Sequence, residues 1–347
     1  YNTYPRINNM SSLELFNAKK MRNIYPIQSE SLYKLYRQAV GSFWLPEEID
    51  LSNDKYDWDN KLKSDEQYLL SNILSFFSQS DKIVNINLDE RFASDIETLP
   101  IDLYKETELF YNAQKTMEDI HSQTYELLLN TYIRDINELE RLTNGLKNIN
   151  AIKKKGIWAK RWIDDKQSSF ATRLVAFAAL EGIFFSGSFC VIFWIKERNI
   201  LKGLTHSNKF ISRDEGLHRD FACELFNLLK NRDDYDLECD NNKVIDIIKE
   251  AVELEKEFIT QSFNCRLVGM NAILMEQYIE YVADHLLNTL NIDKYYNVSN
   301  PFSFMESISL ECKTNFFEER VTEYSKKGFN KKKINDNDND NVLNDDF

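Results

Sequence analysis

Apolar residues recur at a helical spacing of three or four positions along most of the chain. The first periodic stretch is SLYKLYRQAV, and six longer ones follow at residues 65–92, 103–132, 168–198, 207–230, 244–263 and 272–290. The alternation typical of a half-buried strand never lasts more than a few residues, and no repeat of solenoid length is present. The pattern predicts an all-α protein, and 347 residues are enough to bury a large core.

Polar segments divide and flank these periodic stretches. The opening residues are polar and aperiodic, and LTNGLKNINAIKKKG, at residues 142–156, predicts a linker between two helices. After Tyr324 the chain continues as KKGFNKKKINDNDNDN, which is too charged to form a core. We therefore expect an N-terminal arm at residues 1–29, one helical domain at 30–325 and a disordered tail at 326–347.

The stretch LVAFAALEGIFFSGSFCVIFWI, residues 174–195, is apolar on every side and long enough to cross a bilayer. Glu181 lies in its middle, however, where an isolated carboxylate is costly in a membrane, and the sequence has no second stretch of this kind. A helix that is apolar all round is equally typical of the centre of a large bundle. We favour a bundle core and expect no membrane partner.

Three polar residues lie where the helical pattern demands core residues. In KTMEDIHSQTYELLL, Glu118, His121 and Tyr125 follow the spacing i, i+3 and i+7, which places them on one stripe of a helix. The same stripe contains Phe110 and Leu128. A carboxylate, an imidazole and a phenol are therefore expected to point into the interior together.

The pattern Glu-x-x-His occurs a second time, in ISRDEGLHRDFACELF, with its polar residues again on an apolar stripe. Two further helices each carry one inward acid. In chain order the four helices thus offer Asp81, then Glu118 and His121, then Glu181, then Glu215 and His218. One acid from each of two helices and Glu-x-x-His from each of two others are typical of a dinuclear metal centre inside a four-helix bundle.

Each piece of this pattern has a simpler alternative. A single Glu-x-x-His is usually a solvated acid beside a core histidine. Asp81 could cap a turn or pair with Arg91, and Glu181 could pair with Arg173. Together, however, four unpaired buried carboxylates would be very costly, and two divalent ions would neutralise them. Oxygen and nitrogen ligands of this kind suit iron or manganese.

Charge and cysteine content narrow the class of protein further. The net charge of −13 argues against a nucleic-acid partner, because binding the phosphate backbone requires a basic surface. The five cysteines show no Cys-x-x-Cys pairing, which indicates reduced thiols rather than a disulfide framework or a zinc site. The opening YNTYPRINN has no apolar signal segment. We therefore expect a cytoplasmic protein.

Long motifs give the chain a resemblance to a known family. They include SFWLPEEIDLS, SDKIVNINLDERF, MEDIHSQTY, VAFAALEGIFFSGSFCVIFW, SNKFISRDEGLH, GMNAILMEQYIEYVADHLL and NPFSFMESISLECKTNFFEERVTEY. On these motifs the sequence resembles the small, radical-generating subunit of class I ribonucleotide reductase, of the eukaryotic type. The resemblance implies a ferritin-like helical bundle, a homodimer, and an oxidoreductase that supplies DNA precursors together with a large catalytic subunit.

The resemblance also implies roles for single residues. Asp81, Glu118 and His121 would hold one iron ion, Glu181, Glu215 and His218 the other, with Glu118 and Glu215 bridging. The two iron ions would be oxo-bridged when oxidised, and manganese is the alternative metal. Tyr125 would become a stable radical when the reduced centre reacts with oxygen. Its apolar pocket would be formed by Phe185, Phe189 and Ile211.

A path for the radical to the large subunit is implied as well. Trp44 and Asp214 match its beginning next to His121, and Tyr324 matches a mobile tyrosine farther along. The ending VLNDDF resembles the peptide that docks on the large subunit; plain solvation of this acidic ending is the alternative. Two other functions fit less well. A non-catalytic small subunit that supports a radical-bearing partner would lack the ligands or the tyrosine, which are present here. A di-iron oxygenase, desaturase or iron-storage protein with the same bundle usually has Glu in place of Asp81 and lacks the residues of the radical path and the docking tail.

Overall fold

A computed structural model of the chain describes residues 18–262 and 270–306, and all regular elements within these ranges are helices. The all-α prediction is therefore confirmed. The longer helices are α2 (Glu30–Gly41), α4 (Ser64–Asn87), α6 (Ile101–Tyr132), α9 (Asn150–Asp164), α10 (Phe170–Ala179), α11 (Ser186–Glu197), α12 (Lys202–Lys230), α13 (Asn241–Ser262) and α14 (Ala272–Thr289). Shorter elements connect them: η2 (Pro46–Glu48), α3 (Asp54–Lys61), η3 (Leu88–Phe92), α5 (Ala93–Asp95), η4 (Ile96–Thr98), α7 (Ile136–Thr143), α8 (Gly145–Asn148) and η5 (Leu180–Phe184).

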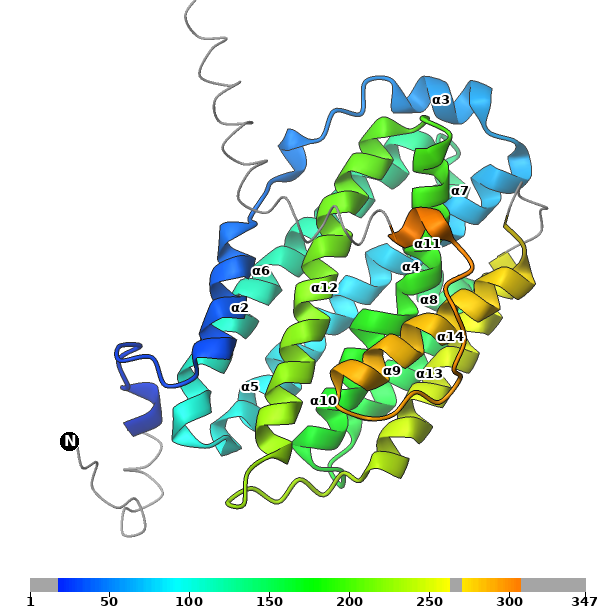
Figure 1. The fold of residues 1–347 in the computed structure, drawn as a ribbon. Helices are drawn as coiled ribbons and strands as arrows, with labels where there is room; N and C mark the ends of the chain where they lie inside the picture. The colour runs from blue at the N-terminus through cyan, green and yellow to red at the C-terminus, as the bar shows by residue number, and fades with distance from the viewer. Residues whose placement is uncertain (1–17, 263–269, 307–347) are drawn as a thin grey trace, which may run out of the picture. The chain divides into compact units, whose positions relative to one another are not determined.

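Four long helical segments form the centre of the bundle. Helix α4 packs on α6, and α12 packs on both α6 and α10 (Figure 1). Helix α2 covers α6 and α12, while α13 and α14 pack on each other and on η5. The apolar stripes that the sequence predicts face this centre, since Phe77, Phe110 and Leu128 are fully buried.

The predicted helix at residues 168–198 is divided into three parts. Helix α10 ends at Ala179, the π-helical turn η5 follows, and α11 begins at Ser186. A π turn contains one residue more than an α turn, so it rotates the side chains that follow relative to those before it. Glu181 lies in this turn. The hydropathy pattern shows an apolar helix here but gives no sign of the rotation.

From its sequence, this segment could be either a membrane-spanning helix or the central helix of a bundle. Phe170–Glu197 is long and apolar enough to cross a membrane, but 94% of an apolar 18-residue stretch within it is buried inside the protein. Its apolar surface is therefore covered by neighbouring helices.

The prediction of a linker at residues 142–156 is wrong. This segment ends α7, contains α8 and begins α9. The run of three lysines conceals the helical pattern, because α9 buries one face through Ala151, Ile152, Trp158, Ala159 and Trp162. Lys155 lies on that buried face as well, although lysine is rarely found there.

Helix α12, which carries the second Glu-x-x-His, is fixed at its N-terminus by acids of α3. The carboxylate of Asp54 accepts hydrogen bonds from the backbone N–H groups of Gly203 and Leu204, at 2.9 and 2.8 Å. Asp57 accepts one from Leu201 at 3.0 Å. The first N–H groups of a helix have no hydrogen-bond partner within it, and a carboxylate at this end is also stabilised by the positive end of the helix dipole. This capping holds α12 in register against the site.

Candidate metal centre

Six predicted ligands from four segments of the bundle converge in its interior. Asp81 comes from α4, Glu118 and His121 from α6, Glu181 from η5, and Glu215 and His218 from α12. All six have at most 2% of their surface exposed. Their ligand atoms form two groups, in each of which the atoms lie within 4.8 Å of one another: Glu118, Glu181, Glu215 and His218, and Asp81, Glu118 and His121. Glu118 belongs to both groups.

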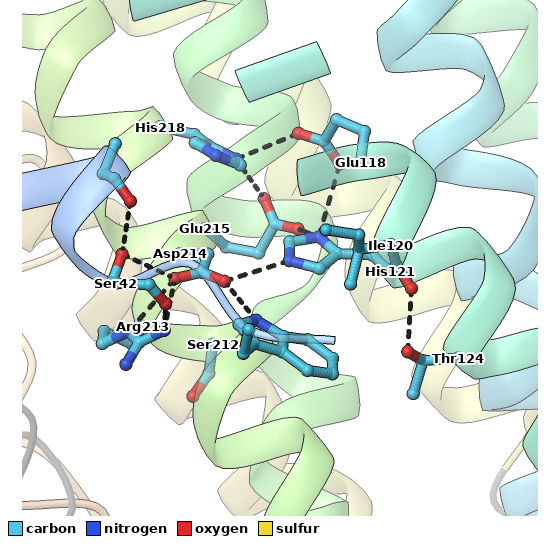
Figure 2. Close-up of polar contacts among 12 residues, drawn as sticks. Ser42, Glu118, Ile120, His121, Thr124, Ser212, Arg213, Asp214, Glu215 and His218 are labelled. Atoms are coloured by element: carbon cyan, nitrogen blue, oxygen red, sulfur yellow. Dashed lines mark hydrogen bonds and ion pairs between the residues drawn. The ribbon is translucent and has the colours of Figure 1, made fainter. Parts of the chain in front are cut away.

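The two imidazoles turn the same nitrogen toward the shared carboxylates. Nδ1 of His121 lies 3.0 Å from Oε1 of Glu215 and 3.5 Å from Oε2 of Glu118. Nδ1 of His218 lies 3.0 Å from Oε1 of Glu118 and 3.2 Å from Oε2 of Glu215 (Figure 2). Glu118 and Glu215 therefore stand between the two histidines, which is the arrangement that bridging ligands require.

The carboxylates have more acceptor capacity than the protein satisfies. In the described part of the chain, both oxygens of Asp81 and one oxygen of Glu181 are buried without a hydrogen-bond partner. Buried polar atoms of this kind are rare, because leaving them unpaired is costly. Oxygens and imidazole nitrogens facing a common centre fit two divalent cations.

The electrostatics of the site lead to the same interpretation. Burial, and then the negative charge of neighbouring carboxylates, raises the pKa values of Asp81 and Glu181 well above their usual range. Burial alone would lower the pKa of His218, but the carboxylates of Glu118 and Glu215 raise it to about 9. Without cations, the site thus retains protons to compensate its crowded negative charge. Cations would replace these protons.

Neither Asp81 nor Glu181 forms the arginine ion pair that the sequence offered as an alternative to metal binding. Arg91 and Arg173 both pair with Asp95, at 3.6 and 2.6 Å, instead of with Asp81 and Glu181. Asp81 lies deep inside α4 and caps no helix end.

Tyr125 lies one helical turn after His121 and is fully buried. Its ring packs on Phe77 with centroids 4.7 Å apart, and Phe77 in turn packs on Phe185 and Phe189, at 5.3 and 5.2 Å. Ile211 is fully buried as well. Burial, together with the charge of Asp81, raises the pKa of Tyr125 well above its usual range, so the phenol keeps its proton.

A chain of hydrogen bonds connects the site with Trp44. Oδ2 of Asp214 accepts a hydrogen bond from Nε1 of Trp44 at 2.8 Å and lies 3.3 Å from Nε2 of His121. Arg213 binds the other oxygen of Asp214 at 2.9 Å (Figure 2). The charge of Arg213, and then His121, outweighs burial and lowers the pKa of Asp214. Asp214 is therefore an anion that joins the imidazole to the indole.

Sequence reasoning missed several contacts of the site. Nε2 of Gln114 donates hydrogen bonds to Glu118 at 3.2 Å and to Glu181 at 2.9 Å. Tyr125 donates its hydroxyl proton to Oδ1 of Asn208 at 3.4 Å. Gln114 lies four residues before Glu118, and Asn208 seven before Glu215, so helical spacing could have placed both on the inward stripes. Tyr324 and VLNDDF lie outside the described residues.

Comparisons with known proteins agree with this geometry. The family model "Ribonucleotide reductase, small chain" matches residues 21–301. The chain is 52% identical to the ribonucleoside-diphosphate reductase small chain of Neurospora crassa, over 88% of this chain and 72% of that protein. It is 53% identical to the small chain of Yaba-like disease virus, over 87% and 89%, and 49% identical to subunit M2 of Homo sapiens, over 88% and 75%.

Solved structures show the same fold. The Rnr4 homodimer of Saccharomyces cerevisiae is 33% identical, with a TM-score of 0.72, over 90% of this chain and 96% of that one. The R2 subunit of Clostridium botulinum ribonucleotide reductase is 21% identical, with a TM-score of 0.74, over 83% and 91%; this likeness concerns the fold alone.

Proposed function

Because the chain belongs to the ribonucleotide reductase small-chain family, and so acts with a large subunit in reducing ribonucleoside diphosphates, we propose that it forms a radical on Tyr125 beside two metal ions. The observation that carries this proposal is the convergence of six buried ligands, with unpaired oxygens, next to a buried tyrosine. When bound, the ions supply the oxygen activation that removes one electron from the phenol.

The protein's own residues would hold the ions and protect the radical. Asp81, Glu118 and His121 would bind one ion, and Glu181, Glu215 and His218 the other. Glu118 would be shared because it belongs to both groups of ligand atoms, and Glu215 because it also lies 3.0 Å from His121. The phenol of Tyr125 would lose its electron and its proton together and become a neutral radical. Phe77, Phe185, Phe189 and Ile211 keep water and reductants away from it, because all four are buried apolar side chains.

We further propose iron as the metal, in keeping with the resemblance to eukaryotic small subunits, and a homodimer, as in the Rnr4 structure. A cytoplasmic location fits three buried free cysteines, Cys190, Cys223 and Cys239. The test is to add ferrous iron and oxygen to the purified chain and record its EPR spectrum. A tyrosyl signal supports the proposal, and bound iron without such a signal contradicts it.

Asp214 is the proposed first link in radical transfer, from His121 to Trp44. Trp44 is 4% exposed and is flanked by the exposed residues Phe43 and Leu45, so it joins the buried site to the surface. In the variant Asp214→Asn we expect the Tyr125 radical to form while nucleotide reduction with the large subunit falls by about 100-fold or more, since proton-coupled steps depend strongly on a positioned acceptor. EPR and turnover assays measure the two quantities.

Asp220→Asn is the matched control, because Asp220 also follows an arginine on α12 but is 44% exposed at its side chain. It should retain full turnover. Equal turnover of the Asp214 and Asp220 variants would contradict the transfer role of Asp214.

The peptide VLNDDF, residues 342–347, is the proposed docking segment for the large subunit. Its support is the sequence resemblance, together with acidic side chains and a phenylalanine that suit capture in a groove. Deleting the last seven residues should abolish assembly with the large subunit, measured by sedimentation or surface binding. The Tyr125 radical should still form in the truncated chain, and unchanged assembly would refute the docking role.

A further inference from the structure

Lys155 of α9 is a charged residue that is almost completely buried, with 2% of its surface exposed. Its ammonium group forms an ion pair with Glu255 of α13, which is fully buried. The same Nζ donates a hydrogen bond to the backbone carbonyl of Phe184 at 3.0 Å. It also lies 3.7 and 4.0 Å from the ring centres of Phe76 and Phe258. Burying two charges is costly, and such a pair generally adds little to stability compared with apolar residues.

The Lys155–Glu255 pair holds two backbone groups at the junction between η5 and α11. Phe184 is the last residue of the π turn, and its carbonyl is bound by Lys155. Gly187 is the second residue of α11, and its N–H donates to Oε1 of Glu255 at 3.1 Å. The two partners thus bind the chain on both sides of the point where the helix changes from π to α.

Gly187 itself indicates how closely this contact is built. A Cβ atom at this position would lie 2.7 Å from Oε1 of Glu255 and 2.7 Å from Cγ1 of Ile259. Real Cβ atoms do not approach other heavy atoms so closely, so any residue larger than glycine would displace the side chains of Glu255 and Ile259. The close approach of α13 to the junction therefore depends on glycine.

The junction is connected to both parts of the proposed site. Glu181 lies within η5, three residues before Phe184. Phe185 follows the turn and packs on Phe76, with ring centroids 5.6 Å apart, and on Phe77, which contacts Tyr125. The ring of Phe76 thus lies between the Lys155 ammonium and the aromatic pocket.

We infer that Lys155 and Glu255 are positioning residues for the metal centre, which fix the π-to-α junction and through it the carboxylate of Glu181 and the ring of Phe185. This inference rests on the proposed function and deepens it. The residues whose backbone the pair contacts, Phe184 and Gly187, are not among the six candidate metal ligands. It acts through the backbone of residues 184–187, whose displacement would move a ligand on one side and a pocket residue on the other.

The test replaces the whole pair, so that no buried charge remains alone. We expect the double variant Lys155→Met/Glu255→Leu to fold, while amide hydrogen exchange in residues 180–190 of the metal-free protein becomes at least about tenfold faster. Co²⁺ binding, followed by its visible absorption, should weaken by about 10- to 100-fold, the usual effect of losing support behind a metal ligand. Exchange in α6 and α12 should not change.

The chain offers a matched control between the same two helices. Lys154 and Glu257 form an exposed pair across α9 and α13 at 2.5 Å. The variant Lys154→Gln/Glu257→Gln should show wild-type exchange and wild-type Co²⁺ affinity. The single variant Glu255→Gln, which keeps an oxygen acceptor for Gly187, should retain most of the protection. If the double variant fails to fold, Gly187→Ala replaces it, because its Cβ would displace Glu255; faster exchange in residues 180–190 of this variant is expected, and wild-type exchange would overturn the inference.

Wild-type exchange in residues 180–190 of the double variant would overturn the inference, as would equal loss of protection in Glu255→Gln and in the double variant. Because the exchange comparison uses metal-free protein, it tests the pair independently of the proposed function. If the wild-type chain bound no Co²⁺, only the metal function would fail, and the exchange rates would still decide whether the pair fixes the junction.

Discussion

The variant Tyr125→Phe is expected to bind two metal ions per chain, show no tyrosyl EPR signal after loading with iron and oxygen, and give no measurable nucleotide reduction. Phenylalanine preserves the packing on Phe77 but has no phenolic hydrogen to lose. The cost in stability should be small, about 1 kcal/mol or less, because the hydroxyl makes only a long hydrogen bond to Asn208. EPR, metal analysis and urea unfolding measure the three effects.

Tyr132→Phe is the matched control for this substitution. Tyr132 lies on the same helix, is buried to the same degree and donates a hydrogen bond to Asp54 at 2.7 Å, but it is seven residues farther from the ligands. Removing the Tyr132 hydroxyl should destabilise the fold more than removing the Tyr125 hydroxyl, and it should leave the radical signal intact. A persistent tyrosyl signal in Tyr125→Phe would show that another tyrosine carries the radical.

Adding ferrous iron without oxygen should stabilise the wild-type chain strongly, and Glu118→Ala should abolish this effect. A ligand that binds only the folded state at about 1,000 times its Kd adds about 4 kcal/mol per site. Glu118 is shared by both groups of ligand atoms, so its removal affects both ions. Thermal unfolding with and without iron gives the difference, and elemental analysis gives the number of ions bound.

Glu126→Ala is the control, because Glu126 lies two turns farther along α6 and forms an exposed ion pair with Lys82. It should keep the full stabilisation by iron, and its exposed pair should contribute little by itself. If Glu118→Ala still bound two ions with the wild-type gain in stability, these carboxylates would not be the metal site. Repeating the thermal unfolding and the elemental analysis with manganese in place of iron shows which metal the site prefers.

The sequence alone was sufficient to place the candidate ligands on buried faces, because helical periodicity assigns a face to every residue. Glu118 and His121, like Glu215 and His218, lie three residues apart on apolar stripes, so their burial follows from the spacing. A charge such as Glu181 within an apolar helix is costly to bury alone and therefore indicates a buried partner. These inferences need only local geometry and the cost of burying a charge.

Local geometry does not say which helices are neighbours, and here the sequence was insufficient. The convergence of α4, α6, η5 and α12 depends on tertiary packing, because the candidate ligands on successive segments are more than 30 residues apart in the sequence. Asp95 lies four residues after Arg91, so helical spacing could have suggested that pair. The pairing of Arg173 with the same Asp95 could not be predicted, because it joins distant parts of the sequence. Phe77 lies on an apolar stripe like any core residue, and only the tertiary structure places its ring against Tyr125.

The sequence by itself determined an all-helical chain, its inward-facing acids, histidines and tyrosine, and through long motifs its family. The tertiary structure alone decided that residues 142–156 are largely helical, that a π turn carries Glu181, and that Lys155 is buried against that turn. The physical reason is the range of the forces involved. Periodicity and burial cost act within one helix, whereas a π turn and a buried ion pair exist only where neighbouring helices supply their partners.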